Sequence, residues 1–149
     1  MAYRWQMGKT FKRTHGAVEC LYTFGDEQLR LKIIGALCTS SLRVVVKDLD
    51  RCAQQCNARS MTVDMRGVVL AVNYEELLRS PANLSPAVRN IPAGLLVPNG
   101  DVLTFREFAW EQAKHGVLRG VFEEPEQAGK WAEKQAEVRH YFQIQAPAR

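Results

Sequence analysis

The sequence predicts an α/β fold, with a mixed, mostly parallel five-stranded sheet and about four helices in the order β-β-α-β-α-β-α-β-α. Short apolar runs alternate with longer segments whose apolar residues recur at helical spacing. The first two runs are separated only by the turn GDE at residues 25–27, so they form a hairpin and at least one pairing is antiparallel. The length of 149 residues suits one domain.

The hairpin strands are expected at residues 17–24 and 28–37, the second with alternating apolar and basic residues. A helix follows, because apolar residues recur at i, i+3, i+4 and i+7. Ser40 or Ser41 is expected to cap this helix and Asn57 to end it. The positions that form its apolar stripe are Leu42, Val45, Val46, Leu49, Cys52, Ala53 and Cys56.

A third strand is expected over residues 60–72, with a break at Gly67 that permits the backbone to turn. Residues 73–80 predict a short helix. Residues 81–90, with two prolines, predict a loop.

The C-terminal part alternates strand and helix twice more. We expect in turn a compact buried strand, a helix, a fifth strand and a last helix, over residues 92–100, 101–116, 117–124 and 125–139. Asn99 or Asp101 is suited to cap the first of these helices and Gly116 to end it, while Pro125 fits the first turn of the last helix. Residues 140–145 either add a short strand or pack against the domain.

The net charge of +4 is concentrated at the N-terminus. Residues 1–15 contain four Lys or Arg and no acid, so residues 16–149 are formally neutral. We therefore divide the chain into a basic N-terminal arm, residues 1–15, and a single domain, residues 16–149. No basic stripe with interleaved aromatic residues follows the arm, so nucleic-acid binding is not expected.

The remaining composition predicts a cytoplasmic protein without a metal or cofactor. No apolar run approaches the roughly 20 residues that span a bilayer, and the N-terminus lacks the apolar segment of a secretory signal. No two cysteines form a C-x-x-C pair and the histidines are scattered, so a metal site is not indicated. The four cysteines, Cys20, Cys38, Cys52 and Cys56, are interpreted as reduced core residues.

The element order and three strings together resemble the STAS-like superfamily over residues 16–136. The strings are VDMRG at 63–67, PAGLLVP at 92–98 and LRGVFEEPEQAGKWA at 118–132. This superfamily includes bacterial anti-sigma-factor antagonists, and small stand-alone relatives are grouped near the lipid-binding CRAL-TRIO domains. The resemblance implies a stand-alone bacterial regulatory protein.

The resemblance also implies that Asp64 to Gly67 form a strand-to-helix turn. In the antagonists this turn carries Asp, any residue, a phosphorylatable Ser and Gly. Asp64 and Gly67 match, but Arg66 stands at the position of the serine. Because arginine accepts no phosphoryl group and keeps its positive charge, the serine switch does not carry over.

We therefore expect a non-enzymatic regulatory or interaction module, in which residues 67–78 and the neighbouring strand ends bind a protein partner or a second copy. The candidate binding residues are Asp64, Arg66, Gly67, Val72, Tyr74, Leu77 and Leu78. One alternative, implied by the resemblance, is a carrier of a small apolar or lipid-like ligand. The other is a small hydrolase or transferase that uses Asp64, although no nucleophile elbow, P-loop or G-x-G-x-x-G accompanies it.

Phe108 and Trp110 are the remaining candidates, both on the helix expected at 101–116. They fit either the margin of the core or a partner-binding patch. We favour the core margin, because aromatic side chains often lie at a core edge.

Overall fold

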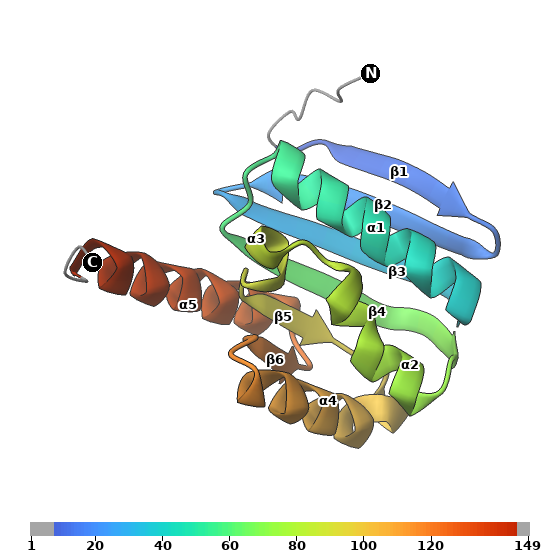
Figure 1. Cartoon of the computed structure of the whole chain (residues 1–149). Helices are drawn as coiled ribbons and strands as arrows, with labels where there is room; N and C mark the ends of the chain where they lie inside the picture. Colours follow the sequence, from blue (N-terminus) through green and yellow to red (C-terminus); the bar gives the residue numbers. More distant parts are fainter. Residues whose placement is uncertain (1–7, 146–149) are drawn as a thin grey trace.

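The structure is a computed structural model that describes residues 8–145, with side chains described up to Tyr141 (Figure 1). The strands are β1 (Thr10–His15), β2 (Val18–Gly25), β3 (Gln28–Cys38), β4 (Ser60–Ala71), β5 (Ala93–Leu96) and β6 (Arg119–Phe122). The helices are α1 (Thr39–Gln55), α2 (Tyr74–Arg79), α3 (Pro86–Arg89), α4 (Val102–Lys114) and α5 (Pro125–Gln145). Two short 3-10 turns, η1 (Ser80–Asn83) and η2 (Asn99–Asp101), complete the described elements.

The predicted α/β class with a mixed sheet is confirmed, but the described sheet has six strands and five helices accompany it. The strands lie in sequence order from β1 to β6. β1–β2 and β2–β3 are antiparallel, whereas β3–β4, β4–β5 and β5–β6 are parallel. The predicted turn between β2 and β3 is a two-residue loop in which Asp26 and Glu27 both have positive φ, as in a type I′ hairpin.

The strand β1 was not predicted, because Thr10–His15 fall in the basic arm of the sequence interpretation. They pair with β2 from Thr10↔Thr23 to His15↔Val18. The strand is largely polar, with exposed and half-buried residues alternating, so its sequence resembles a solvated segment. Residues 1–7 of the arm lie outside the described residues.

The expected break at Gly67 is wrong, because β4 continues from Ser60 to Ala71. Its pairing with β3 runs Lys32↔Asp64 and then Ile34↔Gly67, so β4 carries one extra residue. This irregularity is a β-bulge, which absorbs a residue without ending the strand. The strand-to-helix turn expected at Asp64–Gly67 is therefore a bulge within β4.

Two further segments differ from the sequence prediction. The expected loop at 81–90 contains η1 and the short helix α3, because Pro81 and Pro86 occupy first-turn positions where a missing N–H costs little. The Ser85 hydroxyl accepts a hydrogen bond from the backbone N–H of Val88 at 3.4 Å and caps α3. Residues 140–145 extend α5 and do not form the short strand that was one of the two expectations.

The two faces of the sheet are covered unequally (Figure 1). Helices α1 to α4 lie on one face, where the main apolar core is packed. On the other face α5 packs against β4, β5 and β6. The contact is close because Gly94 has no side chain: a Cβ there would lie 2.6 Å from the carbonyl oxygen of Ala128. On this face α5 reaches β3 only at its first residue, Gln28, which donates to the Gly129 carbonyl. No described helix covers the rest of β3, or β1 and β2, on this face.

No helix among residues 8–145 has the length and apolar character needed to cross a bilayer.

Candidate functional site

The uncovered part of the sheet forms a surface that we call the open face. Strand alternation places on it the residues Lys12, Glu19, Leu21, Arg30, Lys32, Ile34, Ala36, Asp64, Arg66, Gly67, Val69 and Ala71. Ile34 and Val69 are large apolar side chains that are 38% and 68% exposed. Ile34 lies beside Gly67, where a Cβ would contact it at 3.5 Å, and Ala36 pairs with Val69. An exposed apolar strip therefore runs over the second halves of β3 and β4.

The rim of this strip is basic. The open face carries four cations but only two carboxylates. Lys12 Nζ lies 3.3 Å from Glu19 Oε1, and Arg66 pairs with Asp64. Arg30 Nε donates to the neutral Gln28 at 3.2 Å. Lys32 lies beside Asp64 in the sheet but forms no ion pair within 4 Å among the described residues. The surface thus keeps a surplus of positive charge beside its apolar strip.

Asp64 and Arg66 form a closed pair across the bulge in β4. Arg66 Nε donates to Oδ1 of Asp64 at 3.0 Å and Nη2 donates to Oδ2 at 2.8 Å, while the Arg66 backbone N–H donates to Oδ1 at 3.1 Å. Partial burial alone would raise the pKa of Asp64, but these hydrogen bonds and the charges of Arg66 and Lys32 outweigh it and lower the pKa below 3.8. A carboxylate bound in this way is a poor general base.

The other predicted binding residues lie on the opposite side of the sheet. Leu77 is buried in the core, and Val72, Tyr74 and Leu78 are half-buried against it. Partial burial and the carboxylates of Glu107 and Glu111 in α4 raise the pKa of Tyr74, so this side chain faces α4. The structure therefore groups Asp64, Arg66 and Gly67 on the open face and separates them from the other four.

Phe108 and Trp110 also differ in position. Phe108 is buried in the core, where its ring meets that of Phe105 edge-on with centroids 6.1 Å apart. Trp110 is 67% exposed, and Lys114 Nζ lies 4.2 Å from its ring centroid. The core interpretation therefore suits Phe108, whereas Trp110 packs under a lysine at the surface.

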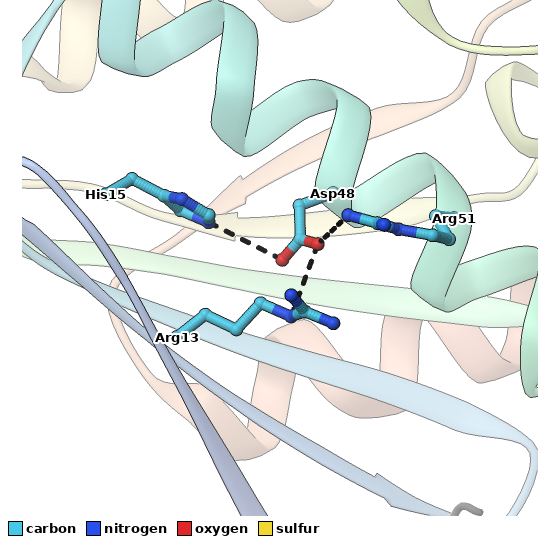
Figure 2. A network of polar contacts seen from close by, with 4 residues as sticks. All are labelled: Arg13, His15, Asp48 and Arg51. Atoms are coloured by element: carbon cyan, nitrogen blue, oxygen red, sulfur yellow. Dashed lines mark hydrogen bonds and ion pairs between the residues drawn. The ribbon is translucent and has the colours of Figure 1, made fainter. Parts of the chain in front are cut away.

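Sequence reasoning missed a buried polar network between β1 and α1 (Figure 2). The Asp48 carboxylate of α1 is 1% exposed and accepts a hydrogen bond from Arg51 Nη2 at 2.7 Å. Arg13 Nε lies 3.3 Å from Oδ1 of Asp48 and His15 Nε2 lies 3.6 Å from Oδ2. Asp48 lies three residues after Val45 in the apolar stripe of α1, and an acid in such a stripe is the signal that could have identified it.

The network also surrounds side chains of β2 and α1. Burial and, next, the Asp48 charge raise the pKa of Cys20 to about 11 and that of Cys52 to about 12. The same two causes raise the pKa of Tyr22 far above its ordinary range. These groups stay protonated, so the network holds β1, β2 and α1 together rather than supplying a nucleophile.

Cys38 is exposed, so its interpretation as a core residue is wrong. It ends β3 on the side away from the core, because Leu37 takes the buried position. Its Sγ lies 3.2 Å from the Ser40 hydroxyl and 3.3 Å from that of Ser41, and these contacts lower the thiol pKa to about 6. Together with His15 it lines a shallow hollow of about 310 Å³.

A small apolar cavity of about 100 Å³ lies between the sheet and the helices α1 and α4. Ser80 and Arg119 are its only polar lining residues in the described part of the chain. Its volume is well below the roughly 300–1,000 Å³ typical of ligand sites. A long acyl chain does not fit this space.

Residues 8–141 contain no group of three or more His, Cys, Asp or Glu side chains placed to hold a metal ion. Neither the protein-family models nor the curated proteins compared with this chain match it.

Proposed function

We propose that this chain is a non-enzymatic regulatory module of bacterial, cytoplasmic type that binds a protein partner through its open face. The observation that carries the proposal is the exposed apolar strip of Ile34 and Val69, on the part of the sheet that α5 leaves uncovered. Exposed apolar surface rimmed by polar residues is typical of protein-interaction sites.

The positive charge of the open face indicates the charge of the partner segment. Arg30 and Lys32 both precede Ile34 in β3 and form no ion pair within 4 Å among the described residues, so the face presents positive charge at one end of the strip. A second copy of this chain bound face to face would bring like charges together, which is unfavourable. The partner segment is therefore acidic, with apolar side chains that cover Ile34 and Val69.

Membership of the STAS-like superfamily belongs to the same proposal. From β3 onward strands and helices alternate, and this element order supports the proposal. In the sequence resemblance Arg66 stands at the position of the family's phosphorylatable serine, although here that position lies within β4 and not at a strand-to-helix turn. Because arginine accepts no phosphoryl group, the proposed interaction surface has no phosphorylation switch at this position.

The partner is tested with one substitution and a matched control. Val69→Asp places an acid in the strip, whereas Leu103→Asp makes the same change at a residue of α4 that is 75% exposed. Proteins bound by wild type are identified by mass spectrometry, and the binding of each purified candidate is measured by calorimetry. We expect Val69→Asp to weaken binding at least about tenfold, as for a central interface residue, and Leu103→Asp to leave it unchanged. Equal binding by both variants would overturn the proposal.

The apolar cavity favours a second candidate function, binding of a small apolar molecule. An engineered cavity of about 150 Å³ lined by similar residues binds benzene, so this cavity is suited only to molecules of that size or smaller. Native mass spectrometry of the purified protein decides: a retained mass supports the ligand, and a bare mass together with no binding of added benzene excludes it.

A further inference from the structure

A second hollow lies at the other end of the sheet, where β4 and β5 begin. It measures about 320 Å³ and opens between the C-terminal half of α5 and the loop that leads into β5. Arg139 and His140 of α5 line one side, Arg59 lies before β4, and Asn90 and Ile91 form the opposite side. None of these residues belongs to the open face.

The lining of the hollow is basic and contains no acid. Arg59 Nη1 is partly neutralised by Glu27, whose Oε2 lies 3.1 Å away on the protein surface. Arg139 has no ion pair within the described side chains. Its helical neighbours at three and four residues before it are Ala136 and Gln135, so no acid is placed to pair with it along that face of α5.

A buried guanidinium outside the lining of this hollow holds one of its walls through the Ile91 carbonyl. Arg119 is largely buried and donates to the backbone carbonyls of Ile91 at 2.8 Å, Leu118 at 2.8 Å and Arg89 at 3.1 Å, with no carboxylate partner in the described structure. Burial and, next, the charge of Arg139 lower the pKa of Arg119 to about 10. The charge of Arg139 therefore acts on Arg119, and neither guanidinium forms an ion pair with a described carboxylate.

We propose that this hollow binds a small phosphate-bearing anion. Arg139 and Arg59 supply charged donors from two sides, His140 adds an imidazole ring, and Arg119 fixes the Ile91 carbonyl and so the wall opposite α5. Guanidinium groups match phosphate oxygens in pairs of parallel hydrogen bonds. A phosphate carries about −1.5 to −2 charges at neutral pH, so it matches the unpaired Arg139 and the partly neutralised Arg59 better than a singly charged carboxylate would.

The site is independent of the proposed partner surface. The hollow lies where β4 and β5 begin, whereas the apolar strip lies toward the ends of β3 and β4. Loss of phosphate binding would leave the proposed interaction unaffected, and failure of the interaction would leave phosphate binding unaffected.

The test uses the full chain and inorganic phosphate. Binding is measured by calorimetry for wild type, Arg139→Gln and the control Lys134→Gln, which removes one positive charge from an exposed position of α5 outside the hollow. We expect saturable binding by wild type and Lys134→Gln, and binding about tenfold weaker or more in Arg139→Gln, the loss of a charge-assisted contact. Equal binding by the two variants, or none by wild type, would overturn the site.

Two further arms secure the interpretation. Acetate, added so that its total negative charge equals that of the phosphate, should bind more weakly than phosphate. Equal binding of the two anions would contradict the proposal that the hollow prefers phosphate. NMR titration of the wild type should shift the backbone amides of Asn90 and Ile91 with phosphate but not with chloride. This measurement needs no variant, so it decides the proposal even if Arg139→Gln fails to fold; shifts elsewhere only would contradict it.

Discussion

Arg66 and Asp64 face each other across the bulge of β4, with the guanidinium bound to both carboxylate oxygens at 3.0 and 2.8 Å. The pair gives the stretch SMTVDMRGVV its structural role. It stabilises an extra residue within a continuous strand, and it removes Asp64 from the chemistry that a free carboxylate at a strand end would offer. The pair carries no net charge, so the surplus positive charge of the open face comes from Arg30 and Lys32.

The first prediction concerns the pH dependence of this pair. The pKa of Asp64 is lowered in the folded state, so its contribution to stability is present above the ordinary value of 3.8 and is lost as the pH falls through the folded pKa. The contribution at neutral pH is below about 1 kcal/mol, because Arg66 is exposed and solvent screens the pair. Between about pH 7 and pH 2, urea unfolding should show a larger loss of stability in wild type than in Asp64→Asn. Equal losses would contradict the lowered pKa.

The second prediction concerns the buried acid of α1. Asp48→Asn leaves Arg13 and Arg51 without their counter-charge beneath β1. We expect a loss of about 3 kcal/mol in the free energy of unfolding, the low end for a broken buried pair, because both arginines stay partly hydrated. Hydrogen exchange should show faster exchange of the amides of β1. As a control, Arg51→Gln removes a side chain that is 57% exposed and should cost below about 1 kcal/mol. Similar losses in both variants would argue against the network.

The third prediction concerns cysteine reactivity. The pKa of Cys38 is about 6, whereas burial raises those of Cys20, Cys52 and Cys56 to about 11 or 12. Iodoacetamide at neutral pH should therefore alkylate Cys38 first in the native protein, because the thiolate is the nucleophile. Peptide mapping identifies the site, and the rate should rise with pH to a midpoint near 6.

The Ser hydroxyls supply the control for that experiment. Ser41→Ala removes one hydroxyl that lowers the pKa of Cys38, so the alkylation midpoint should move to higher pH. Cys38→Ser should leave no rapidly alkylated residue among the described cysteines. An unchanged midpoint in Ser41→Ala would show that this hydroxyl is not a cause of the lowered pKa of Cys38.

The fourth prediction concerns the packing of α5. A Cβ at Gly94 would lie 2.6 Å from the carbonyl oxygen of Ala128, so Gly94→Ala must push α5 away from β5. We expect a loss of about 1–3 kcal/mol in thermal or urea unfolding, the usual cost of overpacking. Gly25→Ala makes the same chemical change at a glycine with open space around its Cβ and should cost much less. Equal losses of stability in Gly94→Ala and Gly25→Ala would contradict the close contact between α5 and β5.

Much of the candidate site depends on pairings that no local pattern reveals. The alternating sequence around Lys32 and Ile34 predicts a strand. The exposure of these two side chains, however, depends on where α5 crosses the sheet. The hollow at Arg139 joins α5 to residues about fifty positions earlier, and the sequence gives no sign that Arg139 and Arg119 approach each other.

The sequence by itself determined the α/β class, the hairpin and the long helices, because helical spacing, turn residues and caps act over a few residues. Only the tertiary structure decided that β4 passes Gly67 through a bulge, that Thr10–His15 join the sheet and that Asp48 is buried beneath them. Strand pairing and ion pairing between distant segments stabilise these three features. Their contribution outweighs the local preference for a turn at Gly67 and for a solvated basic arm. The open face follows from the same cause, since one helix, α5, covers only the strands it can reach.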